Sequence, residues 1–189
     1  MRIIKVKGGL GNQMFQYGFA KYVEMLTGEA VKIDMSSYEA EIEDKIRKPR
    51  LLKYNISLDI ASLSEIKRIR KFQVKGSPLS IEDKIKNILE AIFNSKYYME
   101  SDRAYRKPES LLKYMYLDGY WQSWRYLVDI EDQLRKEFTP NYCMNIATIN
   151  LQNKMKNETN MFIGVRRGDY LKDSKHYGEF GERYYNSAI

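Results

Sequence analysis

The chain is poor in the residues that build disulfides, zinc sites and histidine-based catalytic triads. Its 189 residues include one cysteine, Cys143, and one histidine, His176. A single cysteine excludes an internal disulfide and indicates a reducing compartment. A Cys/His zinc site cannot form, and a triad would have to use His176, which lies in a polar stretch typical of a solvated loop. Any catalysis must therefore rest on carboxylates, arginines, amides and backbone groups.

The sequence also lacks long hydrophobic runs and Asp-x-Asp pairs. Residues 1–7 have no apolar signal-peptide core, and no later run approaches the length of a membrane span. We therefore expect a cytoplasmic protein. Without an Asp-x-Asp pair, the usual carboxylate pair that holds a metal ion on a nucleotide-sugar phosphate is missing. A bound diphosphate would need arginines and backbone N–H groups instead.

Positive charge and tyrosine are what the chain has in excess. The 32 Lys+Arg against 25 Asp+Glu give a formal charge of +7, which favours a nucleotide, a nucleic acid or an acidic membrane face as partner. Aromatic residues reach 13%, with 16 tyrosines. Such a surplus can line a carbohydrate site, although packing in a core is the commoner use.

The order of the expected elements predicts an α/β fold. Residues 2–7 alternate apolar and basic side chains and indicate a strand, and a glycine turn follows. Residues 12–26 carry an apolar helical face that ends before Gly28, and residues 30–34 indicate a second strand. This βαβ opening predicts a Rossmann-like parallel sheet.

Later segments continue the alternation of helices and strands. The patterns predict strands over 114–117 and 161–165, and helices over 63–75, 81–92, 130–138 and 145–157. The helix at 63–75 is basic, which is typical of a solvated face, and residues 80–83 resemble a capping box. The apolar run 161–165 is typical of a buried strand that opens into a loop at two arginines.

The first glycine motif, GGLGNQ over residues 8–13, stands where a nucleotide-binding turn would stand. Gly9 and Gly11 begin the dinucleotide fingerprint, and Asp34 ends the second strand at about the ~20-residue distance of its acidic residue. Met14 occupies the place of the third glycine, so a dinucleotide-dependent oxidoreductase is the less favoured alternative. The glycines could also serve a tight turn alone.

Two segments offer hydrogen-bond donors to an anion. Asn12 and Gln13 place side-chain amides at a helix N-terminus, where N–H donors converge. Arg166 and Arg167 offer planar, permanently charged groups suited to phosphate oxygens, and Gly168 allows close backbone approach. Ligands of open α/β sheets lie at the carboxyl ends of strands, where both segments are expected. Taken alone, the arginine loop is more typical of a surface turn.

An aromatic segment, YWQSW over residues 120–124, follows the expected strand at 114–117. It offers a sugar-stacking platform or a well-anchored core turn. Packing in the core is the commoner use of large rings, and we expect it for Trp121 and Trp124.

Three segments in this order, GGLGNQMFQY (8–17), GYWQS (119–123) and VRRGDY (165–170), resemble bacterial α-1,2-fucosyltransferases of glycosyltransferase family 11. The resemblance extends from Lys7 to the last residue, where 184–189 resemble the start of a helix. It implies transfer of L-fucose from GDP-fucose to a galactose 2-hydroxyl, with inversion and without a metal ion or other cofactor. Gly164 stands where the family often has histidine.

The resemblance also implies a two-Rossmann-domain (GT-B-like) architecture. Residues 1–157 would form the N-terminal, acceptor-side domain, and residues 158–189 the start of the donor-binding domain. Because family members continue well beyond this length, we expect the second domain to be truncated and incomplete. A non-catalytic remnant of such an enzyme is therefore an alternative to an active transferase.

In the arginine motif, the resemblance implies donor-binding roles. Arg166 would grip the donor pyrophosphate and neutralise charge on the departing GDP, which is electrostatic catalysis. Arg167, Gly168, Asp169 and Tyr170 would complete this part of the donor site. Asp169 is expected to orient an arginine instead of acting as base, because neighbouring guanidiniums lower a carboxyl pKa.

The resemblance places the other expected contacts in the N-terminal half. Asn12, as a second catalytic candidate, and Gln13 would face the cleft and bind the donor together with Gly9 and Gly11. Acceptor contacts are expected from Tyr120, Trp121 and Gln122. The expected partners are GDP-fucose and a galactose-containing glycan, including one linked to a lipid, with peripheral contact at the inner membrane face. No nucleic acid is expected as partner.

Overall fold

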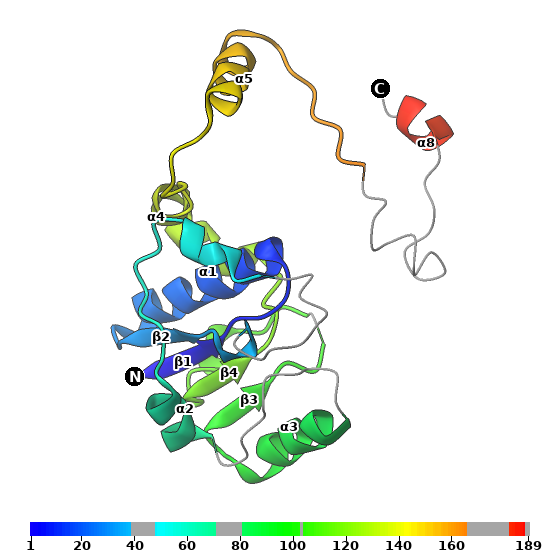
Figure 1. Cartoon of the computed structure of the whole chain (residues 1–189). Helices are drawn as coiled ribbons and strands as arrows, with labels where there is room; N and C mark the ends of the chain where they lie inside the picture. The colour runs from blue at the N-terminus through cyan, green and yellow to red at the C-terminus, as the bar shows by residue number, and fades with distance from the viewer. Residues whose placement is uncertain (39–47, 71–80, 103, 166–181, 188–189) are drawn as a thin grey trace. The chain divides into compact units, whose positions relative to one another are not determined.

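The structure is a computed structural model that describes residues 1–38, 48–70, 81–102, 104–165 and 182–187 (Figure 1). The chain divides into two compact units, Met1–Tyr142 and Cys143–Ile189, which are treated separately. The elements of the first unit, in chain order, are β1 (Arg2–Lys5), α1 (Leu10–Thr27), β2 (Val31–Asp34), α2 (Leu63–Ile69), α3 (Ile81–Phe93), β3 (Tyr97–Met99), β4 (Tyr116–Asp118) and α4 (Glu131–Glu137). Short 3₁₀ helices cover Ser36–Tyr38, Arg50–Lys53, Pro108–Ser110, Trp124–Tyr126 and Val128–Ile130.

The four strands form one parallel sheet in the order β2-β1-β4-β3. Ile33 and Ile60 add an isolated parallel bridge beyond β2. The predicted α/β fold with a Rossmann-like parallel sheet is therefore confirmed. From β1 the chain first builds β2 on one side and later returns to place β4 on the other. The sheet thus has a topological switch point between β1 and β4, the position at which open α/β sheets bind ligands.

Both faces of the sheet are buried, because neighbouring residues of a strand point to opposite sides. On one face Ile4 and Leu117 join the main core, which also contains Phe19 of α1. On the other face Ile3 and Tyr116 belong to a second buried cluster. Strands covered on both faces read as apolar runs, which is the pattern that located β4 at residues 114–117. Strand β1 was predicted instead from its alternating apolar and basic residues.

Helix α1 crosses the main core and ends as the sequence predicts. Of its expected apolar face, Phe19, Tyr22 and Val23 are buried, whereas Leu26 is largely exposed near the end. Gly28 follows in the left-handed conformation, with φ 63°, and its N–H donates to the Glu24 carbonyl at 2.9 Å. Glycine adopts this conformation without steric cost, which is why it ends the helix there.

One predicted helix boundary in the first unit is wrong, and two features were not predicted. Helix α2 ends at Ile69, because Arg70 takes an extended conformation, so the basic helix does not continue to residue 75. Its N-terminus has a capping box between Ser62 and Glu65, which the sequence analysis missed; the one expected at 80–83 begins outside the described residues. Strand β3 was also missed, since three residues after a helix give too short a pattern to recognise.

The second unit contains α5 (Ile146–Asn157) and α8 (Glu182–Asn186). The predicted buried strand at 161–165 is wrong: the segment forms no strand, and Phe162 is 88% exposed. A strand is stabilised by its neighbours, and no described residue pairs with this segment. The proposed domain boundary at 157 stays a prediction. Within the described ranges, no helix is long and apolar enough to cross a membrane.

Candidate active site

The loop between β1 and α1 is fixed by a glycine that no other residue replaces easily. Gly8 has φ +84°, and a Cβ there would lie 2.7 Å from Asn12 Nδ2. The Gly8 carbonyl accepts hydrogen bonds from Tyr38 OH at 2.8 Å and from Gln13 Nε2 at 2.9 Å. The turn is therefore held in one conformation from two directions.

Gln13 ties this turn to the segment near residue 50. Its side chain is fully buried, and its Nε2 also donates to the Lys48 carbonyl at 2.8 Å. Its Oε1 accepts from the Leu51 N–H at 2.9 Å. Because both ends of the amide are engaged, Gln13 shapes the wall of the site. Its predicted contact with a donor stays a prediction.

The N-terminus of α1 lies next to the fixed turn and is open. Gly9 is its N-cap residue, no side chain caps the helix, and the first turn has no acidic residue. A Cβ at Gly9 or at Gly11 would meet no atom within 4 Å. Within the described residues, a larger side chain at Gly9 or Gly11 would therefore meet no steric obstacle. Uncapped N–H groups and the helix dipole make this end suitable for an anion.

A hydrogen bond joins the two motifs that the structure describes. Gln122 Nε2 donates to Asn12 Oδ1 at 2.7 Å, across 110 residues of sequence. Asn12 stands in the first turn of α1, and Gln122 follows the carboxyl end of β4. Both side chains are half-buried. The contact therefore lies at the switch point and brings together two amides that the sequence analysis had selected separately.

The two tryptophans of the aromatic segment have different environments. Trp121 is buried and stacks on Phe19 with ring centroids 4.1 Å apart, so its expected core role is confirmed. Trp124 is 68% exposed, so the same expectation is wrong there, because the chain turns outward into a 3₁₀ helix. With its ring in the core, Trp121 supports the segment from within. Tyr120 and Gln122 are both half-buried, and the acceptor contacts expected of them stay predictions.

The backbone at Trp121 is strained and held by a carboxylate. Trp121 has φ 53°, which is uncommon for a large side chain and costs roughly 1–3 kcal/mol. Glu100 Oε2 accepts from the backbone N–H of Tyr120 at 2.5 Å and of Trp121 at 3.4 Å. Gly119 is required here, because its Cβ would lie 2.7 Å from the Trp121 ring.

Beneath this segment, Asp118 forms a buried charge cluster. Lys7 Nζ donates to its Oδ1 at 2.5 Å, Lys5 Nζ lies 3.5 Å from Oδ2, and Tyr97 OH donates to Oδ2 at 3.1 Å. Burial by itself would raise the pKa of Asp118, but the charges of Lys5 and Lys7 outweigh it and lower that pKa to about 2. The Lys7 ammonium also lies 5.0 Å from the Tyr120 ring centroid.

Lys7 and Asp118 were not predicted as site residues from the sequence. Their common signal is position: each lies at or just beyond the carboxyl end of a central strand. A charged residue at that place in two neighbouring parallel strands predicts a contact. The charge cluster fixes the end of β4 and, through Lys7, the ring of Tyr120.

The carboxylate of Asp34, the residue that suggested a dinucleotide site, already accepts hydrogen bonds from within the protein. It is buried, its Oδ1 accepts from the Ser36 N–H at 2.8 Å, and its Oδ2 accepts from Tyr116 OH. A ribose would have to displace these partners and reach a side chain that is 1% exposed. This arrangement argues against the oxidoreductase alternative.

The donor-side residues Arg166, Arg167, Gly168, Asp169 and Tyr170 lie outside the described residues. Their predicted roles therefore carry no geometry. Among the residues that are described, no group of three or more His, Cys, Asp or Glu side chains is arranged to hold a metal ion.

The parallel sheet, with a fixed glycine turn and an amide pair at its switch point, defines a Rossmann-like domain with a candidate ligand site at that point. The family model described as Glycosyl transferase family 11 matches residues 1–188, and the chain belongs to this family. The chain is 28% identical over 193 residues to an Alpha-1,2-colitosyltransferase from Escherichia coli. It is also 28% identical over 203 residues to the O-antigen biosynthesis glycosyltransferase WbnK from the same species.

These alignments cover 99% and 97% of the chain but only 62% and 65% of the two relatives. The chain thus spans less than two thirds of the length of the curated relatives it matches. No solved structure matches the chain significantly.

Proposed function

We propose that the protein takes part in transferring L-fucose from GDP-fucose to the 2-hydroxyl of a galactose in a glycan or polysaccharide precursor. The observation that carries the proposal is the hydrogen bond between Asn12 and Gln122. It unites two of the three family motifs at the position where a parallel sheet binds ligands, beside an open helix N-terminus.

In this proposal the N-terminal unit supplies the acceptor side and one wall of the donor site. The amide of Asn12 and the N-terminus of α1 face the diphosphate, with Gly9 and Gly11 allowing close approach. Tyr120 and Gln122 contact the acceptor sugar. Arg166 neutralises the negative charge that develops on GDP as the glycosidic bond breaks, so the reaction needs no metal ion.

The sugar that is transferred has a second candidate. One relative is named as a colitosyltransferase, and colitose differs from fucose by the absence of the 3-hydroxyl group. A site that hydrogen-bonds that hydroxyl discriminates strongly against the deoxy sugar, whereas an apolar site does so weakly. Comparing the two GDP-sugars therefore decides between them. A remnant that binds GDP without transfer is the other alternative.

The test is incubation of the purified chain with GDP-fucose or GDP-colitose and a soluble galactoside, with product detected by mass. We expect a product one deoxyhexose heavier, and we expect Arg166→Ala to abolish it with an unchanged circular dichroism spectrum. The matched control is Arg135→Ala, because Arg135 is 74% exposed and pairs with Glu131 alone among the ion pairs described. Absence of product together with no GDP-dependent thermal shift would refute the proposal.

We also propose that the acceptor is attached to a lipid and that the protein works at the inner membrane face. The net charge of +7 supports this location, because both a pyrophosphate-linked lipid and the membrane surface are anionic. Transfer to a lipid-linked galactoside that exceeds transfer to the free sugar would support it.

A further inference from the structure

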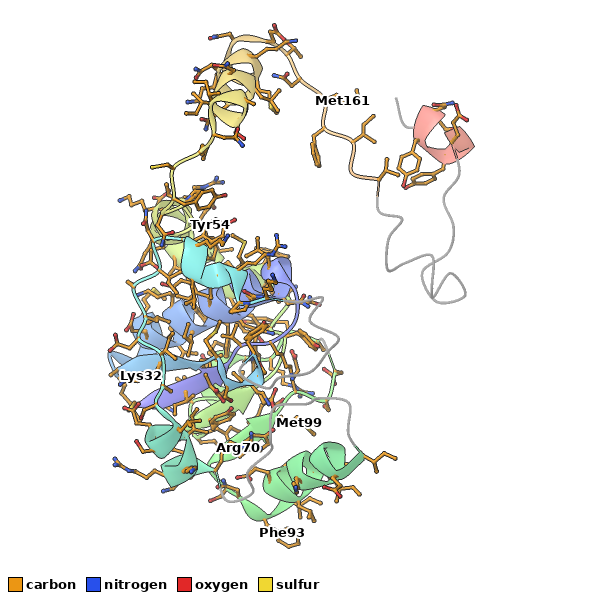
Figure 2. All side chains as sticks on the ribbon, in the orientation of Figure 1. Lys32, Tyr54, Arg70, Phe93, Met99 and Met161 are labelled. Atoms are coloured by element: carbon orange, nitrogen blue, oxygen red, sulfur yellow. The ribbon has the colours of Figure 1, made fainter. Side chains whose placement is uncertain are left out.

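Glu100 lies outside the three family motifs but is hydrogen-bonded to one of them. Strand β3 ends at Met99, which Figure 2 labels, and Glu100 follows directly. Because β3 and β4 are parallel neighbours, Glu100 stands at the same edge of the sheet as residues 119–123. Its own N–H continues the pairing of the strands by donating to the Asp118 carbonyl at 2.8 Å. The register of the two strands therefore places this carboxylate beside the aromatic segment.

The Glu100 side chain accepts hydrogen bonds beyond the point where strand pairing ends. Its Oε2 accepts from the backbone N–H groups of Tyr120, at 2.5 Å, and of Trp121, at 3.4 Å. The two segments approach closely, since a Cβ at Gly119 would lie 2.8 Å from the Glu100 Cβ. Hydrogen bonds to a carboxylate are stronger than those to a neutral oxygen, so Glu100 is well suited to hold this backbone in place.

The backbone that Glu100 holds has an unfavourable conformation. Trp121 has φ 53°, and it is the one residue other than glycine with a positive φ in the described part of the chain. For a large side chain this conformation persists only when the surrounding structure holds it. The Trp121 ring stacks on Phe19 in the core, and its N–H donates to Glu100. Backbone strain of this kind occurs preferentially at binding and catalytic sites.

The same backbone determines where the Gln122 amide lies. The Ser123 N–H donates to the Trp121 carbonyl at 2.8 Å, which closes a three-residue turn with Gln122 at its centre. From this turn the Gln122 side chain donates to Asn12 Oδ1 at 2.7 Å. A series of hydrogen bonds and peptide units thus connects Glu100 to the first turn of α1.

We propose that Glu100 is a positioning residue for the acceptor sugar, which binds to side chains that Glu100 holds in place. It acts through two half-buried residues: Tyr120, whose ring centroid lies 5.0 Å from Lys7 Nζ, and Gln122. A ring can stack on the apolar face of a sugar, and an amide can donate to its hydroxyl groups. The inference rests on the proposed function, because it takes residues 120–122 as the acceptor side. Misplacing such groups by about 1 Å can lower a rate ~100-fold.

The competing role for Glu100 is that of a general base that takes the proton from the attacking hydroxyl group. A base acts by binding a proton, so Glu100→Gln should abolish its effect. A positioning residue acts through its hydrogen bonds, and the oxygen of a glutamine still accepts from the Tyr120 N–H. Because Oε2 already accepts from two backbone donors, the contacts favour the positioning role.

The test measures initial rates of transfer by the whole chain, with saturating GDP-fucose and a varied concentration of a soluble galactoside. Glu100→Ala should lower kcat/KM for the acceptor at least about tenfold, mainly through KM, while the protein is still stabilised by GDP against heat. Glu100→Gln should stay within about threefold of the parent chain. Glu100→Asp keeps the charge but shortens the side chain by one methylene, and it replaces the Ala variant if that variant does not fold. The matched control is Glu109→Ala, which removes an exposed carboxylate from the same connection between β3 and β4.

Three results would overturn the positioning role: Glu100→Ala behaves like Glu109→Ala, Glu100→Gln loses transfer as fully as Glu100→Ala at an unchanged KM, or Glu100→Ala no longer responds to GDP. If no protein shows transfer, galactoside binding measured by saturation-transfer NMR separates the two proposals. Binding that is lost in Glu100→Ala and kept in Glu100→Gln would support the positioning role although the proposed function has failed. Equal binding by all variants, or no binding by the parent chain, would overturn the positioning role as well.

Discussion

Asn12 Oδ1 accepts a hydrogen bond from Gln122 Nε2 at 2.7 Å, and this contact joins the first turn of α1 to the end of β4. The two strands that lead to it, β1 and β4, are neighbours in the parallel sheet. The bond therefore closes a site between segments that only the topology of the fold brings together. This bond uses one N–H of Gln122 and none of the Asn12 amide, since each side-chain amide has two N–H groups.

We expect the energetic coupling of these two amides to be measurable in a double-mutant cycle. Asn12→Ala and Gln122→Ala should each lower the free energy of unfolding by about 0.5–1.5 kcal/mol. The double variant should lose less than the sum, because the second change removes no further bond. Urea denaturation measures the three values. Pairing either change with Gln152→Ala on exposed α5 provides the additive control, and additivity of the first pair would contradict the contact.

Two glycines of the same turn should respond in opposite directions. Gly8→Ala should cost about 1–3 kcal/mol, because of its positive φ and the clash with Asn12. Gly11→Ala should leave stability unchanged or raise it by up to ~1 kcal/mol, since the site is open and alanine favours a helix.

The Gly11→Ala variant also tests the donor site. If a diphosphate approaches the start of α1, Gly11→Ala should weaken the thermal stabilisation given by GDP although the fold is intact. An unchanged response to GDP in this variant would place the diphosphate elsewhere.

Asp118 should make folding stability depend on acidity. Its folded-state pKa of about 2 lies below the ordinary 3.8, so its charge stabilises the folded state at pH values above 3.8. That contribution, on the order of 2 kcal/mol, should be lost as the pH falls from about 4 to 2. Asp118→Asn should remove this part of the pH dependence and destabilise the chain at neutral pH by about 3–5 kcal/mol, because Lys5 and Lys7 lose their partner. Urea denaturation at pH 7, 4 and 3 would measure the free energy of unfolding of both proteins. If that free energy changed equally with pH in the two proteins, both statements would be refuted.

The two tryptophans should differ sharply in their effect on stability. Trp121→Ala removes a buried ring that stacks on Phe19 and should cost about 3–5 kcal/mol. Trp124→Ala changes an exposed ring and should cost less than about 1 kcal/mol. Thermal unfolding followed by circular dichroism is sufficient, and equal losses would contradict the assignment of one ring to the core.

The parallel sheet could be predicted because the βαβ opening gives unambiguous signals. Gly28 ends α1 in the left-handed conformation that its position suggested, and the period of Phe19 and Val23 defines the buried face. At the site, the motifs identified Asn12 and Gln122 as separate candidates. Their mutual contact depends on the pairing of β1 with β4, a non-local property that no local pattern contains.

Other errors have a common physical origin in tertiary context. Residues 161–165 have the composition of a buried strand but form none, because composition cannot supply a pairing partner. The helix predicted over 81–92 is present as α3, but the spacing of its isoleucines does not show that they are exposed while Glu90 and Asn94 are buried. Periodicity identifies a face without saying what covers it.

The buried amide of Gln13 links the glycine turn to residues 48–51 through hydrogen bonds. It holds the Gly8 carbonyl, the Lys48 carbonyl and the Leu51 N–H at once, so none of the three can shift alone. A ligand that stabilises the turn should therefore slow amide hydrogen exchange at the Leu51 N–H, although no ligand atom contacts that group.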